Sequence, residues 1–264
     1  MRAAWITDAH LDFVSIGRGR TFLNEIRAAQ PDALLVGGDT GQAPIVRSCL
    51  EVIAQFLQCP VYFVLGNHDY YRGSIVELRE AMKTHGPGGR LCWLGACTSI
   101  PLSHETGLVG HGSWGDGRFG DFQNSPVQMN DFLLIRELGG LKAPDLLRKL
   151  QDLGDEAARH FETVLPAALD EYRHVVVLTH VAPFLEAAWY DGRPSDDDYA
   201  PFFACKATGE VLRSAMERHP DRTMTVLCGH THGSGVVRIL PNLIVYTGGA
   251  EYGRPEVQRV FEWP

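Results

Sequence analysis

Five short apolar runs, each stopped by a glycine or a polar residue, constrain the fold of this chain more than any other feature of its sequence. They span residues 2–7, 33–37, 61–65, 174–179 and 223–228. Continuous apolar runs of this length are typical of strands that are buried on both faces. We therefore expect these strands to lie inside a layered protein.

Helical patterns separate several of the runs, most clearly at 19–29, 43–58, 73–84 and 208–219. Strands that alternate with helices predict an α/β domain. Further β segments are expected at 91–100, 106–110, 236–240, 243–247 and 257–262. These are too many strands for one small open sheet, so we expect two packed sheets.

The segment 125–172 interrupts this alternation. Apolar residues recur in it at helical spacing, and Gly154 and Pro166 predict a break and a kink. The segment either packs plainly against a sheet or forms a cap over an active site. Because the sequence has no internal repeat and no obvious linker, residues 1–264 are predicted to form a single domain with a helical insertion at 125–172.

Composition excludes several classes of protein. The 264 residues carry a formal net charge of −8 and are 45% hydrophobic, which is ordinary for a globular chain. The acidic balance makes nucleic acid an unlikely partner. No apolar run reaches the ~20 residues of a membrane helix, so we expect no membrane partner.

The N-terminus and the cysteines bear on the compartment. The first residues lack the pattern of a removable leader. None of the six cysteines forms a C-x-x-C pair, and although Cys92 and Cys97 could pair across a turn, nothing in the sequence demands it. A reduced, cytoplasmic protein is the expectation; the oligomeric state is left open.

Each of the five apolar runs leads directly into a short polar segment. The segments are Asp8-Ala9-His10, Gly38-Asp39, Gly66-Asn67-His68-Asp69, Thr179-His180 and Gly229-His230-Thr231-His232. The crevice beyond the carboxyl ends of strands is where ligands bind in open α/β sheets. Loops at the strand ends can therefore bring residues that are distant in sequence into one site.

Together these segments offer two carboxylates, four imidazoles and one amide oxygen as metal ligands. Mixed oxygen and imidazole ligands suit divalent manganese, iron or zinc. Seven donors are too many for one ion that keeps positions open for solvent and substrate, but they suit two ions that share a bridging carboxylate. Such a pair can clamp a phosphoryl group and generate a hydroxide near neutral pH.

In this order the segments resemble the pattern of the calcineurin-like metallophosphoesterases: D-x-H, G-D, G-N-H-[DE], H and G-H-x-H. The resemblance implies an α/β fold, a four-layer α/β/β/α sandwich of two mixed β-sheets flanked by helices, with two divalent metal ions (manganese, iron or zinc). By position it assigns one metal to Asp8, His10, Asp39 and His232. It assigns the other to Asp39, Asn67, His180 and His230, with Asp39 bridging.

The resemblance also implies roles outside the ligands. His68 would bind phosphate or protonate the leaving oxygen, and Asp69 would orient backbone or His68. Many relatives have a second Asp, paired with that histidine, where this chain has Gln42. A glutamine oxygen can accept the imidazole N–H, but it does not raise the histidine pKa as a carboxylate does.

Two segments are candidates for the rim of the site. In 110–121, Trp114 could stack on a base and Arg118 could grip a phosphate; the alternative is a surface connection with Trp114 tucked inward. The segment 183–206 follows His180 directly, and its acidic run, 196–198, is most simply a solvated face.

The predicted function is metal-dependent hydrolysis of a small phosphodiester or phosphomonoester by a metal-bridging hydroxide. One alternative is a DNA or RNA nuclease of the same superfamily, which the absence of a basic tail after His232 disfavours. The other is a catalytically silent protein-binding scaffold, which is disfavoured because every ligand position is filled.

Overall fold

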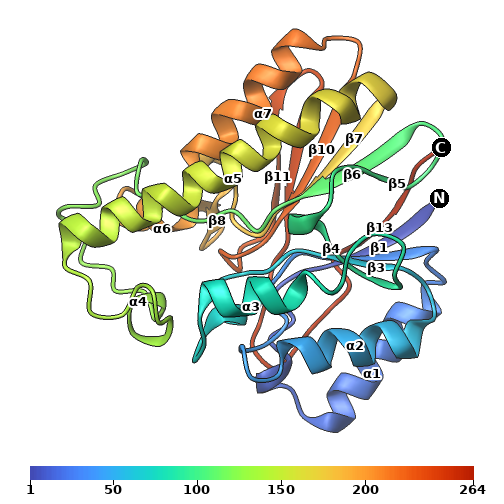
Figure 1. Ribbon diagram of the computed structural model, residues 1–264, viewed down its shortest axis with the longest axis horizontal. Coiled ribbons are helices and arrows are strands. Elements are labelled where there is room, and N and C mark those ends of the chain that lie inside the picture. The colour runs from blue at the N-terminus through green and yellow to red at the C-terminus, as the bar shows by residue number, and fades with distance from the viewer.

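A computed structural model describes all residues, 1–264, and arranges them in four layers, with helices outside two facing sheets (Figure 1). The first sheet has the strand order β13-β1-β2-β3-β4. Its strands are β1 (Arg2–Ile6), β2 (Ala33–Val36), β3 (Val61–Phe63), β4 (Leu91–Trp93) and β13 (Arg259–Glu262). All neighbours are parallel except β13, which pairs antiparallel with β1.

The second sheet has the order β11-β12-β10-β7-β6-β5. Its strands are β5 (Ile100–Pro101), β6 (Thr106–Gly110), β7 (His174–Leu178), β10 (Thr223–Cys228), β11 (Gly235–Leu240) and β12 (Leu243–Thr247). The four inner strands are parallel and the two edge strands are antiparallel to their neighbours. A separate hairpin joins β8 (Trp189–Tyr190) to β9 (Arg193–Pro194).

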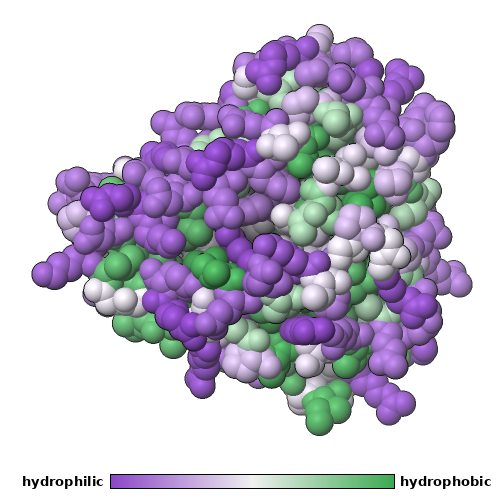
Figure 2. Space-filling model, viewed as in Figure 1, coloured by the Kyte–Doolittle hydropathy of each residue, from purple (hydrophilic) through white to green (hydrophobic).

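Helices cover the outer face of each sheet (Figure 1). The first sheet carries α1 (Ile16–Ala28), α2 (Val46–Leu57) and α3 (Ile75–Met82), and the second carries α5 (Ala143–Glu171) and α7 (Lys206–Arg218). Two short helices are α4 (Asp131–Leu134) and α6 (Ala200–Phe203). No helix combines the length and apolar character needed to cross a bilayer. Hydrophilic side chains dominate the face seen in Figure 2.

The alternation of side chains along the strands explains why both faces of each sheet are buried. In β1, Ala3 and Trp5 pack between the sheets, whereas Ala4 and Ile6 pack toward the helices. Leu178 of β7 joins the layer between the sheets from the other side. The strands therefore feed two apolar layers at once, as their continuous apolar sequence predicts.

The expected strand at 91–100 is wrong as a single element. The chain leaves β4, makes a 3-10 turn at Leu94–Ala96, and enters β5 in the other sheet. An apolar sequence cannot reveal this crossing, because residues on both sides of it are buried. At the crossing the Sγ atoms of Cys92 and Cys97 lie 3.3 Å apart, and all six cysteines are free.

The expectation for 125–172 also needs correction. Helix α5 runs without interruption through Gly154 and Pro166, so the predicted break is wrong. A Cβ on Gly154 would lie 2.6 Å from the Cβ of Asp116, so this glycine permits a close approach between helix and loop. Helix α5 packs on α7 and β6, so for this helix the structure matches the alternative of plain packing against a sheet.

Candidate metal centre

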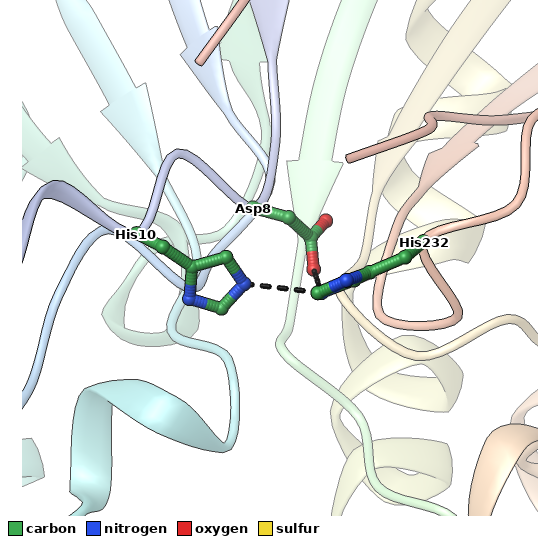
Figure 3. A group of neighbouring side chains, drawn as sticks. All are labelled: Asp8, His10 and His232. Carbon is green, nitrogen blue, oxygen red and sulfur yellow. Dashed lines mark hydrogen bonds and ion pairs between the residues drawn. The ribbon is translucent and has the colours of Figure 1, made fainter. Parts of the chain in front are cut away.

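The polar segments converge where the parallel strands of the two sheets end. Six of the seven predicted donors are buried, and His232 is partly exposed; the donors are Asp8, His10, Asp39, Asn67, His180, His230 and His232. Figure 3 shows Asp8, His10 and His232 pointing toward one another, although they come from opposite ends of the chain. The structure therefore brings together every residue that the sequence predicted as a metal ligand.

The donors form two groups. In the first, the Nε2 atoms of His10 and His232 lie 3.0 Å apart. Nε2 of His232 lies 3.6 Å from Oδ1 of Asp8, and Nε2 of His10 lies 3.8 Å from Oδ2 of Asp39. Asp8, His10 and His232 thus offer ligand atoms that all lie within 4.8 Å of one another, and Asp39 adds an oxygen beside His10.

The second group lies on the other side of Asp39. Oδ1 of Asn67 lies 3.0 Å from Nε2 of His180 and 2.9 Å from Nδ1 of His230. Nε2 of His180 also lies 3.3 Å from Oδ1 of Asp39. The two carboxylate oxygens of Asp39 therefore face different groups, which is the geometry of a bridging ligand.

Four of the six separations, from 2.9 to 3.3 Å, fit pairs of ligands on one ion, and the two longer ones, 3.6 and 3.8 Å, need wider angles of about 120–135°. Two ligand atoms about 2.0–2.1 Å from one ion lie about 2.9–3.4 Å apart at angles of about 90–110°. The hydrogen bonds behind the imidazoles also fit. Nδ1 of His180 lies 2.9 Å from the Gly37 carbonyl oxygen, and Nε2 of His230 lies 3.1 Å from that of Phe202. Each carbonyl selects the tautomer that leaves the inward nitrogen unprotonated.

The charges and protonation states of the donors favour the binding of cations. Burial, with neighbouring imidazoles, lowers the pKa of His180 and of His230 to about 3, so both rings are neutral. Burial, with the adjacent Asp8 carboxylate, raises the pKa of Asp39 well above its usual range. No lysine or arginine forms an ion pair with Asp8 or Asp39. Neutral imidazoles beside uncompensated carboxylates are what divalent metals bind.

The backbone is strained at the same place. Five of the seven donors have a positive φ, from 40° to 74°: Asp8, His10, Asp39, His230 and His232. Left-handed backbone costs a non-glycine residue about 1–2 kcal/mol, and such strain clusters at functional sites.

Two glycines of the motif segments are required for steric reasons, because any side chain there would meet a donor carboxylate. A Cβ on Gly66 would collide with Oδ1 of Asp39, and one on Gly229 would collide with Oδ2 of Asp8.

Asp69 organises the backbone around the bridging residue. Its carboxylate accepts hydrogen bonds from the backbone N–H groups of Asp39 (3.0 Å), Thr40 (2.9 Å), Gly41 (3.1 Å) and Gly66 (2.8 Å). Of the two roles expected for Asp69, these contacts match the orientation of backbone and not of His68.

His68 lies beside both groups. Its ring stacks on Tyr71 at a centroid distance of 4.2 Å and lies 4.6 Å from the ring of His10. Its Nδ1 is buried without a hydrogen-bond partner. Gln42 does not reach it, because its side-chain amide donates instead to Asp12 (3.0 Å). The expectation that Gln42 accepts from this imidazole is therefore wrong.

The environment of His68 makes it a neutral imidazole. Burial is the largest cause that lowers its pKa to about 3, and His180 adds to the effect. No carboxylate is paired with the ring to raise the pKa again. His68 can therefore donate a hydrogen bond from a neutral N–H, but it holds no second proton at neutral pH.

A cavity of about 230 Å³ opens beside His68, His230 and His232. Its aromatic walls are Tyr71, Tyr190, Phe203 and Tyr252, and Gln128 and Asn130 add two amides. No lysine, arginine, aspartate or glutamate lines it. The Tyr252 ring lies over that of His10 (4.6 Å) and contacts Phe13 (4.8 Å). The cavity is therefore an uncharged, partly aromatic space next to the donors.

The rim expected at 110–121 is corrected by the structure. Trp114 is only 4% exposed and packs on Tyr70 inside the core. Arg118 pairs with the buried Asp116 (2.9 Å) and with Asp155 of α5 (2.7 Å). Neither side chain lines the cavity. This loop ties α5 to the fold. Trp114 points inward, as the alternative interpretation of this segment predicted.

The segment 183–206 does reach the site, through Tyr190 and Phe203. Its acidic run, 196–198, is exposed to solvent. Two residues at the site were not predicted from the sequence: Asp131, which contacts Asn67, and Tyr252, which covers His10. No pattern around either residue signals its position, because Asp131, at the start of α4, and Tyr252, in a loop, approach the motif residues only in the folded chain.

Comparison with known proteins gives one family match and one curated relative. Residues 1–234 match the family model described as calcineurin-like phosphoesterase. A probable cyclic nucleotide phosphodiesterase of Pseudoalteromonas sp. (strain SM9913) is 39% identical over 82 residues, covering 26% of this chain and 31% of that protein. The chain thus aligns with under a third of the length of this relative.

Solved structures share the fold. Phosphopantetheinyl hydrolase from Mycobacterium tuberculosis matches with a TM-score of 0.66 at 12% identity, over 96% of this chain and 90% of that one. A dimetal phosphatase from Danio rerio matches with a TM-score of 0.57 at 13% identity, over 94% and 87%. At such identities the likeness concerns the fold alone, and it agrees with the predicted sandwich of two mixed sheets flanked by helices.

Proposed function

Because the chain belongs to the calcineurin-like phosphoesterase family, we propose that this hydrolase of ester bonds acts on a small phosphodiester. The observation that carries the proposal is the division of seven donors into two groups that share Asp39. Two divalent ions held there, of manganese, iron or zinc, would supply Lewis acidity and a hydroxide nucleophile near neutral pH.

The proposed ligand sets follow the two groups. Asp8, His10, Asp39 and His232 hold one ion, and Asp39, Asn67, His180 and His230 hold the other. Because most of these side chains are buried, their positions are fixed before any ion binds. The net charge of two divalent ions and two carboxylates is positive, so the loaded centre attracts an anionic phosphate.

His68 acts on the substrate from outside the ligand sets. Its neutral ring donates a hydrogen bond either to a non-bridging phosphoryl oxygen or to the leaving oxygen. The stacked Tyr71 ring restricts its rotation. Because no carboxylate is paired with His68, we expect its main contribution to be this hydrogen bond.

The uncharged cavity favours a diester over a monoester. A phosphomonoester carries close to two negative charges at neutral pH, and a diester carries one. Beyond the positive charge of the two ions, the cavity has no lysine or arginine to balance the second charge. Its aromatic walls suit a planar group on the diester, and the partial relative named as a probable cyclic nucleotide phosphodiesterase supports the same direction.

The same observations weigh against a nuclease. Long nucleic acid binds through lysine and arginine contacts to phosphates, but the chain has a net charge of −8 and the 196–198 run is exposed. A cavity of about 230 Å³ is of a size for a small substrate. A silent scaffold is disfavoured because all seven donors are both present and convergent.

The test compares bis-p-nitrophenyl phosphate with p-nitrophenyl phosphate on metal-stripped protein refilled with manganese. We expect faster hydrolysis of the diester, and His180→Ala serves as the inactive control. Faster hydrolysis of the monoester would overturn the diester proposal. Hydrolysis of neither, with two ions bound, would overturn it as well.

A further inference from the structure

Asp131 lies against the metal centre, although it belongs to none of the five motif segments. It is the first residue of α4 and only 3% exposed. Its Oδ1 accepts a hydrogen bond from the Asn67 side-chain amide at 2.8 Å and another from the Tyr71 hydroxyl at 2.7 Å. One buried carboxylate oxygen therefore receives two donors from the G-N-H-D region.

The backbone fixes Asp131 in this position. The N–H of Arg72 donates to the carbonyl of Leu134 at 2.7 Å, and the N–H of Arg136 donates to the carbonyl of Gly73 at 3.1 Å. These bonds clamp α4 to the residues that follow the motif. The contact between Asp131 and Asn67, which are 64 positions apart, is thus built into the fold and not left to a free loop.

The contact decides which end of the Asn67 amide faces the ligands. The two ends of an amide have nearly the same shape, but only the oxygen can bind a cation. Here Oδ1 faces His180 and His230, and the NH₂ faces Asp131. A flipped amide would turn the NH₂ toward the ion and the oxygen against a carboxylate, so an acceptor at Asp131 selects the productive orientation.

The second donor links Asp131 to His68. The Tyr71 hydroxyl donates to Asp131, and the Tyr71 ring stacks on His68 at 4.2 Å with an interplanar angle of 28°. The Tyr71 ring on which His68 stacks is therefore held by the same carboxylate oxygen that orients Asn67.

We propose that Asp131 is a positioning residue that aims the oxygen of Asn67 at the second metal ion and holds Tyr71 against His68. The proposal rests on the proposed function only in that the site binds two ions. Its primary readout is metal binding, so it can be tested whether or not a substrate is identified.

The test pairs Asp131→Asn with Asp131→Leu. Asparagine keeps an oxygen that can accept from both donors, whereas leucine has a similar volume and no acceptor. Manganese binding is measured by calorimetry and by metal content. We expect two ions per chain in wild type and in D131N. In D131L we expect affinity for one of the two ions to fall about 10–100-fold, as removal of groups that support metal ligands does.

Tyr71→Phe separates the two roles. It removes the hydroxyl, which also accepts a longer bond from the Asn67 amide (3.3 Å), but leaves the 2.8 Å bond between Asn67 and Asp131. We therefore expect two bound ions, an unchanged KM and a kcat lowered several-fold on bis-p-nitrophenyl phosphate. Loss of an ion in Y71F would contradict the separate action of Asp131 on Asn67. If the protein hydrolyses neither nitrophenyl ester, the proposed function fails, while the binding results still test Asp131.

Three outcomes would overturn the proposal: tight binding of both ions by D131L, equal loss of affinity in D131N and D131L, or loss of both ions in a folded D131L. If D131L does not fold, a crystal structure of manganese-loaded wild type decides. It should show Oδ1 of Asn67 on an ion and the amide NH₂ on Asp131; any other amide orientation would overturn the proposal.

Discussion

The metal centre and the cavity beside it are built in different ways. The donors sit at the ends of parallel strands, and five of them have left-handed backbone. The cavity walls come instead from the loops and short elements that contain Gln128, Tyr190, Phe203 and Tyr252. Strand ends thus fix where the chemistry takes place, whereas loops decide what reaches it, which matches the general division between rigid scaffold and variable loops.

The largest expected effect comes from the bridging residue. Asp39→Asn removes a charge from the one side chain that faces both groups of donors. We expect fewer than two bound ions and a loss of turnover above the roughly 100-fold seen for supporting residues of metal sites. Metal content and hydrolysis of bis-p-nitrophenyl phosphate measure this. Asp170→Asn, an exposed carboxylate on α5, is the control and should change neither.

His68 stands between the two regions. His68→Ala should lower kcat by about 10²–10³-fold, the usual cost of losing one preorganised donor, while both ions stay bound. His104→Ala, an exposed histidine, should have no effect. A larger loss with a cyclic nucleotide, whose leaving group is an alkoxide, than with a nitrophenyl ester would assign the hydrogen bond to the leaving oxygen. Full activity of H68A would remove His68 from the mechanism.

The cavity is expected to respond through substrate binding. Tyr252→Ala removes a half-exposed ring beside His10 and Phe13. Loss of about 1 kcal/mol of stacking raises KM for an aromatic diester about 5-fold and leaves kcat and metal content unchanged. Tyr252→Phe keeps the ring and should resemble wild type. An unchanged KM in Y252A would show that the cavity wall does not contact the substrate.

The smallest effect on activity is expected from the loop at 110–121. Arg118→Ala leaves the buried Asp116 without its arginine, so the protein should lose stability. A cost of about 1–2 kcal/mol lowers the Tm by roughly 2–8 °C for a chain of this size. Steady-state kinetics should be unaffected, because Arg118 lies outside the cavity. A raised KM would place Arg118 back at the rim.

The features that the sequence predicted well are local ones. The apolar runs and the polar residues at their ends are contiguous in the chain, so the five buried strands and the seven candidate donors that follow them could be read directly. Gly154 was misread because a glycine that permits a close approach looks the same in sequence as a helix breaker. The two alternatives for Trp114 could not be decided from the sequence, because its environment depends on packing against Tyr70 and not on its glycine-rich neighbours.

Asp131 and Tyr252 mark the limit of prediction from sequence. Each acts on a motif residue that is far away in the chain, through a segment that bends back over the site. Nothing within a few residues of either one encodes that contact. The same holds for the walls of the cavity, so the substrate is harder to predict than the reaction class.

In the proposed mechanism, Asp39 divides the donors between two ions that the reaction requires. The most direct test strips the protein with a chelator and titrates it with manganese while bound metal and hydrolysis of bis-p-nitrophenyl phosphate are followed together. We predict that two ions bind per chain and that activity appears only as the second one binds. Full activity with one ion per chain, or with none, would contradict the requirement for two ions.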